Sequence, residues 1–306
     1  MSIAIKERPD SSDSTNRFRN APRSPHFIID QDWDSYSAAE HDRWNRLFKR
    51  SQAILRHRAC DEFIAMMNAL RLSEFGIPDM AKLSDRLEKI TGWRVVPVAG
   101  LVPDHVFFNH LANKCFPAGA FIRSEEEMDY LKEPDIFHDI FGHVPLLASP
   151  IYSDFMQAYG KGGQRAMQLG QLPNLARLYW YTVEFGLIRT KAGLRIFGAG
   201  IVSSAAETVF ALESGSPNRI GFDLERVMRT KYVIDDFQQT YFVIDSFDNL
   251  LAECYQDFGP IYKRIRMVPD IEACELIDSD EVLTMGNLAY FKQNRSTQRV
   301  TRPFST

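Results

Sequence analysis

Apolar residues recur at helical intervals along most of the chain. Ser37 and Glu40 have the spacing of a capping box, and the apolar residues of the following segment, 41–57, recur every three or four positions, which predicts an amphipathic helix. Gly92 stands where a glycine commonly ends a helix. The same periodicity predicts further helices over 60–74, 78–91, 104–115, 149–169 and 173–184.

Strand patterns are few and short. The run 93–98 (WRVVPV) is rich in β-branched residues and leads into a loop at 99–103. Residues 194–212 are interpreted as a strand, a glycine-containing turn and a helix, and residues 231–255 as a further strand and helix. Because helices dominate and the strands are separated, we expect a mostly α fold with short β elements, not a doubly wound sheet.

The two ends of the chain lack this periodicity. Residues 1–30 are rich in Ser, Pro, Arg and Asn and contain no apolar signal core, which predicts a disordered lead-in. Residues 266–306 are expected to form a loosely attached C-terminal extension. A single folded domain is therefore expected over 31–265.

Composition narrows the class of protein. Apolar residues make up 45% of the 306 residues and charged residues 25%, which is typical of a soluble globular protein. The net charge is −4 and no long basic block is present, so the sequence does not indicate a nucleic-acid partner. No run of about 18 apolar residues exists, so no membrane span is expected. The four cysteines form no CxxC and predict reduced thiols in the cytoplasm.

Two histidines, His138 and His143, lie five residues apart in the apolar run EPDIFHDIFGHVPLL. On an unbroken α-helix, a separation of five residues leaves about 140° between the two side chains. A helix that ended at Gly142 would let the chain turn so that both imidazoles face one point, and Pro145 fits just beyond such an end. The zinc-peptidase pattern HExxH is absent, since the spacing differs.

A metal site is one interpretation of this pair, and two packed histidines at the end of a buried helix is the other. Glu133 and Asp135 could orient neighbouring side chains, and the surrounding residues are apolar. A further acidic residue, Glu184, lies among aromatic residues, where an unpaired carboxylate would be costly unless it met a cation. Two histidines and one carboxylate are the facial triad of non-haem Fe(II) oxygenases.

Four motifs in one order along the chain resemble a known family. EPDIFHDIFGHVPLL, YWYTVEFGL, GAGIVSS and FVIDSF together resemble the catalytic domain of the pterin-dependent aromatic amino acid hydroxylases, from about residue 35 to about residue 262, with the bacterial phenylalanine 4-hydroxylases the most similar branch. The resemblance implies that 31–265 is an iron- and pterin-binding catalytic domain. It implies a monooxygenase that uses Fe(II), O2 and a tetrahydropterin to convert L-phenylalanine to L-tyrosine.

The resemblance also implies a role for individual residues. The implied iron ligands are His138, His143 and Glu184. The implied pterin-binding residues are Gly100, Leu101, Val102, Phe107, Asp139 and Tyr179. The implied residues of the amino acid site are Arg123, which would hold the substrate carboxylate, Asp135, which would orient it, and Pro134, Trp180 and Ser203. Without the resemblance, Phe107, Tyr179 and Trp180 would be interpreted as core packing and Ser203 as a helix N-cap.

The chain also departs from the family pattern. The region 116–123 is small where relatives can carry bulkier aromatics, and Leu131 stands where some relatives have Thr, so a preference for tryptophan stays open beside phenylalanine. Trp180 precedes Glu184 by four residues, so on an α-helix both side chains would lie near one face, and its bulk favours phenylalanine. A non-catalytic homologue that binds metal or pterin is a further alternative. Since the regulatory domain and the coiled-coil helix of the animal enzymes are absent, a monomer is expected.

Overall fold

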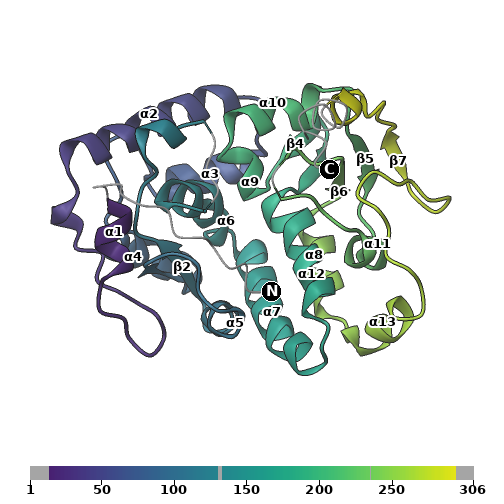
Figure 1. Cartoon of the computed structure of the whole chain (residues 1–306), viewed down its shortest axis with the longest axis horizontal. Helices are drawn as coiled ribbons and strands as arrows, with labels where there is room; N and C mark the ends of the chain where they lie inside the picture. The colour runs from purple at the N-terminus through teal and green to yellow at the C-terminus, as the bar shows by residue number, and fades with distance from the viewer. Residues whose placement is uncertain (1–13, 130–132, 235, 294–306) are drawn as a thin grey trace, which may run out of the picture.

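The computed structural model describes residues 14–129, 133–234 and 236–293, and helices form most of its regular structure (Figure 1). The α-helices are α1 (Ser14–Arg19), α2 (Ala38–Leu55), α3 (Asp61–Ala69), α4 (Met80–Thr91), α5 (Asp104–Ala112), α6 (Val144–Leu147), α7 (Pro150–Gln168), α8 (Leu172–Tyr179), α9 (Ala199–Val202), α10 (Ala205–Glu213), α11 (Leu224–Arg229), α12 (Phe247–Tyr255) and α13 (Phe258–Ile265). The 3-10 helices are η1 (Trp33–Ser35) and η2 (Glu125–Glu127), and the π-helices are η3 (His138–His143) and η4 (Trp180–Glu184). The strands are β1 (Arg94–Val98), β2 (Cys115–Gly119), β3 (Leu187–Thr190), β4 (Gly193–Ile196), β5 (Asn218–Gly221), β6 (Thr240–Ile244) and β7 (Val282–Thr284). The expected mostly α class with short β elements is confirmed.

The predicted helix ends follow from local chemistry. The capping box of α2 is confirmed, because the Ser37 hydroxyl accepts from the Glu40 amide and the Glu40 carboxylate accepts from the Ser37 amide. Helix α4 ends as predicted, with Gly92 in the left-handed conformation at φ 78°. Helix α3 is shorter than the predicted 60–74, since Arg71 adopts a positive φ of 53° that an α-helix cannot continue through.

The β-rich run predicted at 93–98 is confirmed as β1, but its parallel partner β2 was missed in the sequence. The helix predicted over 104–115 ends at Ala112, where Lys114 turns the chain with a φ of 55°, and β2 then runs parallel to β1. The segment 115–119 (CFPAG) contains a proline and no β-branched residue, so it lacks the pattern that normally identifies a strand. The pair matters for the site, because the loop between β1 and α5 holds Gly100, Leu101 and Val102.

The strands of the second half assemble into one sheet, although they are separated in the sequence. Its order is β4-β3-β6-β5-β7, with β6 parallel to both neighbours and the two edge strands antiparallel. All five residues of β6 are buried, as expected of a strand covered on both faces. In Figure 1 this sheet lies on the side of the molecule away from β2, with α7 and α8 between them.

The N-terminal part of the described chain is packed, which corrects the prediction of a disordered lead-in over 1–30. Phe18 is buried in the core, and Ile28 forms an antiparallel bridge with Val98 of β1. A few apolar residues without helical spacing are therefore enough to hold this segment. Residues 1–13 lie outside the described residues.

The C-terminal part is likewise attached, which corrects the loose extension predicted over 266–306. Strand β7 pairs with β5, Ile271 forms a parallel bridge with Thr230, and Phe291 is buried. Backbone pairing with a sheet edge needs no helical periodicity, so the sequence pattern did not reveal it. Residues 294–306 lie outside the described part, and the domain boundaries at 31 and 265 stay predictions.

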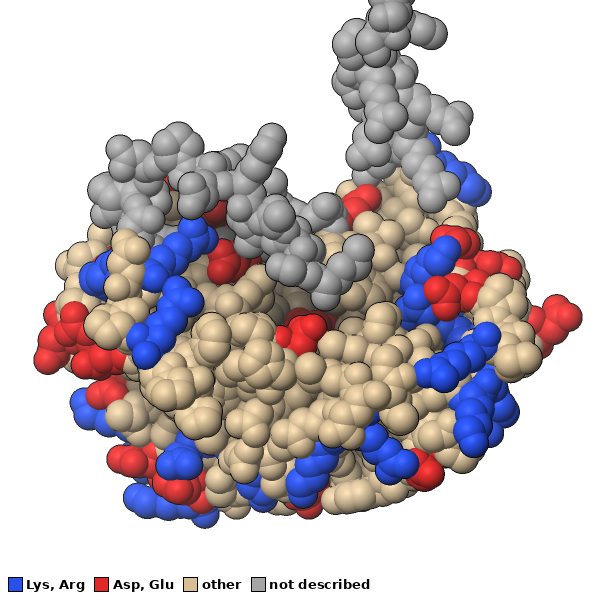
Figure 2. All heavy atoms as spheres, turned by 60° about the horizontal axis from the view of Figure 1, so that its bottom comes forward, with Lys and Arg blue, Asp and Glu red and all other residues tan. Residues whose placement is uncertain are grey.

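The charged side chains on the face drawn in Figure 2 are of both signs, in agreement with the small net charge of −4. On the face seen in Figure 2 the middle is largely uncharged, and most Lys, Arg, Asp and Glu side chains lie around its edge with both signs mixed. Such a mixed rim is unlike the basic stripe of a nucleic-acid-binding surface. Within the ranges that the structure describes, no helix is both long enough and apolar enough to cross a membrane.

Candidate active site

The helix that carries the two histidines is fixed from behind by aromatic rings. Phe137 and Phe141 stack on each other with ring centroids 4.8 Å apart. Phe137 meets Trp44 edge to face, and Phe141 meets Phe48 of the same helix, α2, and Phe63 of α3. These large buried rings anchor one side of the helix. The histidines on its other side are therefore held by a rigid support.

The five-residue spacing of His138 and His143 is explained by a π-helix, which was not predicted from the sequence. The segment does not end at Gly142; it continues as the π-helix η3, whose hydrogen bonds link residues five apart. In that geometry His138 and His143 come to nearly the same face. Gly142 has a different role, because a Cβ there would lie 2.9 Å from the carbonyl oxygen of Ala199. The missing side chain lets α9 pack directly against η3.

Glu184 also lies in a π-helix. Helix α8 ends at Tyr179, short of the predicted helix end at 184, and η4 continues it, with the Phe185 amide donating to the Trp180 carbonyl five residues earlier. The chain leading into α9 approaches this segment too, since a Cβ on Gly198 would overlap the Glu184 carbonyl oxygen. The glycines of GAGIVSS thus allow α9 to lie against both helices that carry the predicted ligands, and so fix their separation.

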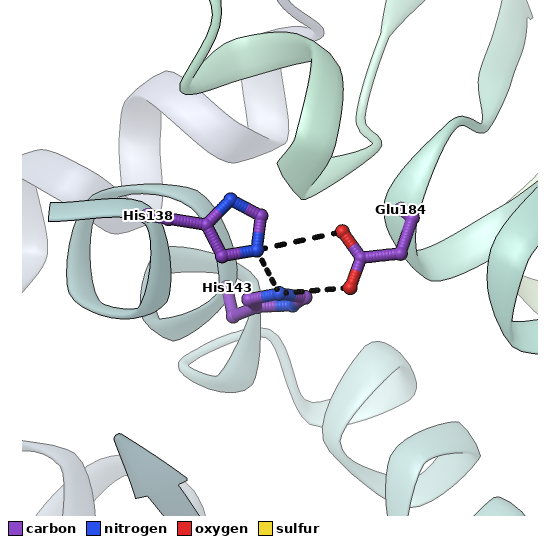
Figure 3. Close-up of side chains that lie close together, drawn as sticks. All are labelled: His138, His143 and Glu184. Atoms are coloured by element: carbon purple, nitrogen blue, oxygen red, sulfur yellow. Dashed lines mark hydrogen bonds and ion pairs between the residues drawn. The ribbon is translucent and has the colours of Figure 1, made fainter. Parts of the chain in front are cut away.

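The three predicted iron ligands point toward one another from these two helices (Figure 3). The Nε2 atoms of His138 and His143 lie 3.1 Å apart. The two carboxylate oxygens of Glu184 lie 3.6 Å from His138 Nε2 and 3.2 Å from His143 Nε2. Within the described residues this is the group of His, Cys, Asp and Glu side chains whose spacing could hold a metal ion.

A serine sets the tautomer of His138. The Ser203 hydroxyl donates its one proton to the Ala199 carbonyl at 2.7 Å, so it accepts from the Nδ1–H of His138 at 2.9 Å. The Nε2 atom of His138 therefore carries a free lone pair that faces the site. The alternative role of Ser203 as an N-cap is wrong, because Ser204 caps α10.

The charges of the site favour a bound cation. Burial lowers the pKa of His138 to about 4, so this imidazole is neutral near pH 7. Burial also opposes protonation of His143, but Glu184 outweighs it and raises the pKa of His143. Burial raises the pKa of Glu184, and the two histidines reverse this and lower it. A carboxylate and two imidazoles thus attract one positive charge, which a metal ion can supply in place of a proton.

The donor set fits a divalent iron ion. Two atoms bound to one ion at about 2.1 Å can lie at most about 4.2 Å apart, and the three measured separations, 3.1, 3.2 and 3.6 Å, all meet that limit. Two nitrogens and one carboxylate are the ligands of a facial triad, which leaves positions open for other molecules. His138, His143 and Glu184 could therefore hold iron with little movement.

Arg123 and Asp135 form a buried, two-pronged ion pair beside the histidines. The Nε and Nη2 of Arg123 donate to the two carboxylate oxygens of Asp135 at 2.8 and 2.9 Å, and the pair is 6% and 0% exposed. Asp135 also accepts from the His138 amide at 3.0 Å. Burial raises the pKa of Asp135, but Arg123 outweighs it and lowers the pKa below its ordinary value. One carboxylate therefore orients both the guanidinium of Arg123 and the backbone of His138.

A row of aromatic rings leads from His143 to the residue predicted to stack on the pterin. Tyr179 lies over the His143 ring at 6.1 Å, and Phe107 meets Tyr179 edge to face at 5.7 Å. Asp139 turns toward β2, where it accepts from the Gly119 amide at 2.7 Å, and burial raises its pKa to about 7. Tyr179 thus connects Phe107 to His143, and Asp139 connects η3 to β2.

The remaining predicted residues are less closely tied to the ligands. Gly100 approaches Glu133, whose carboxylate oxygen a Cβ would meet at 2.5 Å, and Leu101 beside it is 67% exposed. In the described structure, no side-chain hydrogen bond or ion pair joins Leu101, Val102 or Pro134 to the three ligands. Leu131 lies outside the described residues.

Three residues near Trp180 were missed in the sequence analysis. The indole stacks on Tyr232 and hydrogen bonds to Gln238, whose backbone amide in turn donates to Glu207. The segment from Trp180 to Glu184 is π-helical and not α-helical as predicted, so the shared face of the two side chains stays a prediction. Tyr232 and Gln238 lie in the loop before β6, in the segment whose start was predicted to be a strand, and no sequence signal identified their contacts with Trp180.

Comparisons with known proteins place these features in a family. A family model for biopterin-dependent aromatic amino acid hydroxylases matches residues 17–288. The phenylalanine-4-hydroxylase of Caulobacter vibrioides is 61% identical over 266 residues, covering 87% of this chain and 90% of the relative. That of Ralstonia nicotianae is 55% identical over 262 residues, covering 86% and 84%.

A solved structure agrees with the sequence match. The crystal structure of phenylalanine hydroxylase from Chromobacterium violaceum bound to cobalt superposes with a TM-score of 0.86 at 49% identity, covering 90% of this chain and all of that one. This chain therefore belongs to the biopterin-dependent aromatic amino acid hydroxylases, the family that its four motifs resemble.

Proposed function

We propose that this protein is a phenylalanine 4-monooxygenase that uses Fe(II), O2 and a tetrahydropterin to convert L-phenylalanine to L-tyrosine. The observation that carries the proposal is the convergence of His138, His143 and Glu184 on one point, in a chain that is 61% identical to a phenylalanine-4-hydroxylase. The similar Chromobacterium violaceum enzyme has been crystallised bound to cobalt, which supports a transition-metal site in this family.

The metal ligands and their surroundings would prepare the site for the reaction. Iron and the reduced pterin, when bound, supply the electrons and the metal that activate O2. The protein holds His138 with its Nε2 lone pair free, and the packed rings behind η3 keep both imidazoles in place. The ligand side chains are at most 18% exposed, which limits the access of water to reactive species.

Arg123 would bind the carboxylate of the amino acid. Asp135 occupies its Nε and Nη2, which leaves Nη1 for a second carboxylate. Phe137 lies under the guanidinium, with the Arg123 Cζ 5.6 Å from the ring centroid, and helps to fix its plane. Asp135 also accepts a hydrogen bond from the His138 amide. The same carboxylate would therefore position both the substrate-binding arginine and a ligand of the metal.

The aromatic row beside His143 would receive the pterin. We assign the stacking contact to Phe107, which is half-buried and meets Tyr179 edge to face, and Asp139 would meet polar atoms of the pterin. Gly100, Leu101 and Val102 would contact the pterin edge, and Pro134, Trp180 and Ser203 would line the amino acid pocket.

Replacing Phe107 by Ala is expected to raise the apparent pterin KM and leave the iron content unchanged. Loss of a stacked ring costs about 0.5–1.5 kcal/mol beyond the lost area, which corresponds to a rise of about two- to tenfold or more. Steady-state kinetics with varied pterin measures the change. Phe75→Ala is the control, since Phe75 is 87% exposed. An unchanged pterin KM in folded F107A would assign Phe107 to ordinary packing.

One assay separates the proposed function from its alternatives. The protein is loaded with Fe(II) without oxygen, then given O2, reduced pterin and either phenylalanine or tryptophan, and the products are identified. Tyrosine as the main product supports the proposal, and a higher kcat/KM for tryptophan would make the protein a tryptophan hydroxylase. No hydroxylated product with either would favour a homologue that binds metal or pterin without turnover.

We further propose a cytoplasmic monomer. The four cysteines are free thiols, as expected in a reducing compartment. The C-terminal segment that the structure describes pairs through β7 with β5 of its own chain, which supports a self-contained fold. Light scattering of the Fe(II)-loaded chain at a mass near 35.1 kDa would support the monomer, and a doubled mass would refute it.

A further inference from the structure

The indole of Trp180 is held on three sides. Its ring stacks on Tyr232, with centroids 4.4 Å apart and planes 17° apart, and lies 4.8 Å from the ring of Phe185. Its Nε1–H donates to the side-chain oxygen of Gln238 at 2.8 Å. A half-buried indole held only by packing could slide within its stack, whereas the directed hydrogen bond selects one orientation.

Gln238 can act as a fixed acceptor because its own amide is fixed. The side chain is buried, and its Nε2 donates to the carbonyls of Val233 at 3.0 Å and Asp236 at 3.3 Å. Two carbonyls require the NH2 group on that side, and the indole N–H requires the oxygen on the other. A flipped amide would break all three hydrogen bonds, so the orientation is set by the network.

The backbone of Gln238 is anchored by a buried carboxylate. Its amide donates to Glu207 of α10 at 3.4 Å, and the Tyr241 hydroxyl of β6 donates to the same oxygen. Glu207 is 6% exposed. The acceptor that meets Trp180 is therefore connected to a helix and to the central strand of the sheet, and does not depend on its loop alone.

Trp180 is also tied to the metal site. It begins the π-helix that ends at Glu184, and its carbonyl accepts the π-type hydrogen bond from the Phe185 amide, next to the ligand. We propose that Gln238 is a positioning residue: it fixes the Trp180 indole as a wall of the amino acid pocket and thereby sets the preference for phenylalanine over the larger tryptophan. The inference rests on the proposed function, which makes Trp180 part of that pocket.

Gln238→Met tests the role of the acceptor while keeping a similar side-chain length. Without the acceptor the indole can turn aside, and the kcat/KM of tryptophan relative to phenylalanine is expected to rise about fivefold, the effect of one neutral hydrogen bond. The KM for phenylalanine should rise with it, while the pterin KM and the iron content stay unchanged. Trp180→Phe alone should shift the ratio in the same direction.

A double-mutant cycle distinguishes positioning from general stability. In the Trp180→Phe background no indole N–H exists, so Gln238→Met should change the substrate ratio no further. Equal shifts in both backgrounds would overturn the proposal. Gln171→Met is the matched control, because Gln171 is a buried glutamine at the start of α8 whose amide donates to Gly170. It should leave the ratio unmoved.

A second measurement keeps the test decisive if Gln238→Met does not fold. The wild-type indole N–H of Trp180, assigned by its loss in Trp180→Phe, should exchange slowly with deuterium, and fast exchange would overturn the proposal. Gln238→Glu retains an acceptor oxygen and should stay closer to the wild-type ratio than any variant without one. Failure of the proposed function looks different: wild type would then form no tyrosine, whereas the positioning role fails when tyrosine forms and the ratio does not respond.

Discussion

Replacing either His138 or Glu184 by Ala is expected to abolish iron binding and tyrosine formation together. Their ligand atoms lie within 3.6 Å of one another. Within the described residues no other His, Cys, Asp or Glu side chain belongs to this group, so none is placed to replace a missing ligand. Loss of an outer partner of a ligand typically costs about 10–100-fold in metal affinity or activity, and loss of the ligand itself should exceed that. Iron per chain and product formation are measured on the same samples.

The control is a histidine outside the site. His110 is buried and bonds to the His26 carbonyl, so His110→Ala removes a buried imidazole without touching the ligands. That variant should retain iron in its folded fraction. A normal iron content in either ligand variant would show that the convergent geometry does not hold the metal.

Metal removal gives a second test of the same site. Chelation should remove activity, and Fe(II) should restore it. Zn(II) suits the same two nitrogens and carboxylate, yet it has no redox chemistry, so it should bind without restoring turnover. Full activity in rigorously metal-free protein would refute the metal assignment.

The helices could be predicted because their signals are local. The capping box at Ser37 and the left-handed glycine at Gly92 act within one turn of the chain, and both predictions are confirmed. The packed ends could not be predicted in this way. Ile28 and Ile271 form isolated β-bridges with Val98 and Thr230, which are distant in the sequence. No periodic pattern near Ile28 or Ile271 predicts these partners.

The site shows the same division between local and distant signals. The five-residue spacing of His138 and His143 excluded a shared face on an α-helix, and no local pattern predicted the π-helix that brings them together. The contact of Ala199 with Gly142 joins segments that are distant in the sequence. Residue type and motif order predicted His138, His143 and Glu184 as ligands, and the structure brings these three side chains together. Gln238 lies in a loop and Trp180 in a helix, and the two meet only in the folded chain. No local sequence pattern could therefore predict their hydrogen bond.

Replacing Arg123 by Met is expected to destabilise the fold by about 3–5 kcal/mol, because it leaves the carboxylate of Asp135 buried without its partner. Urea unfolding measures the loss. The exposed pair of Arg46 and Glu125 offers the control: Arg46→Met removes a similar two-pronged contact, but solvent screens it and stability should change little.

The pH dependence of this loss identifies its cause. In wild type, burial raises the pKa of Asp135, but Arg123 outweighs burial and lowers this pKa below its ordinary value. The ion pair therefore stabilises the fold fully at pH values above the unfolded-state pKa of about 3.9. This contribution is lost as the pH falls through the folded-state pKa. In R123M only the backbone amides of His138 and residue 123 still oppose the effect of burial, so the folded pKa of Asp135 should lie higher than in wild type. Protonation of Asp135 at low pH should then relieve the buried charge and recover part of the stability that the variant has lost. The difference in the free energy of unfolding between wild type and R123M should therefore become smaller as the pH falls toward about 4.

Arg123→Lys separates the structural role from the substrate role. Lysine keeps the positive charge beside Asp135, so part of the lost stability should return, but it lacks the planar fork that can hold two carboxylates at once. The KM for phenylalanine should stay raised about tenfold or more, the cost of a charge-assisted hydrogen bond, while the pterin KM is unchanged. A lysine variant with wild-type phenylalanine KM would limit Arg123 to holding Asp135, and the substrate carboxylate would then have to bind elsewhere.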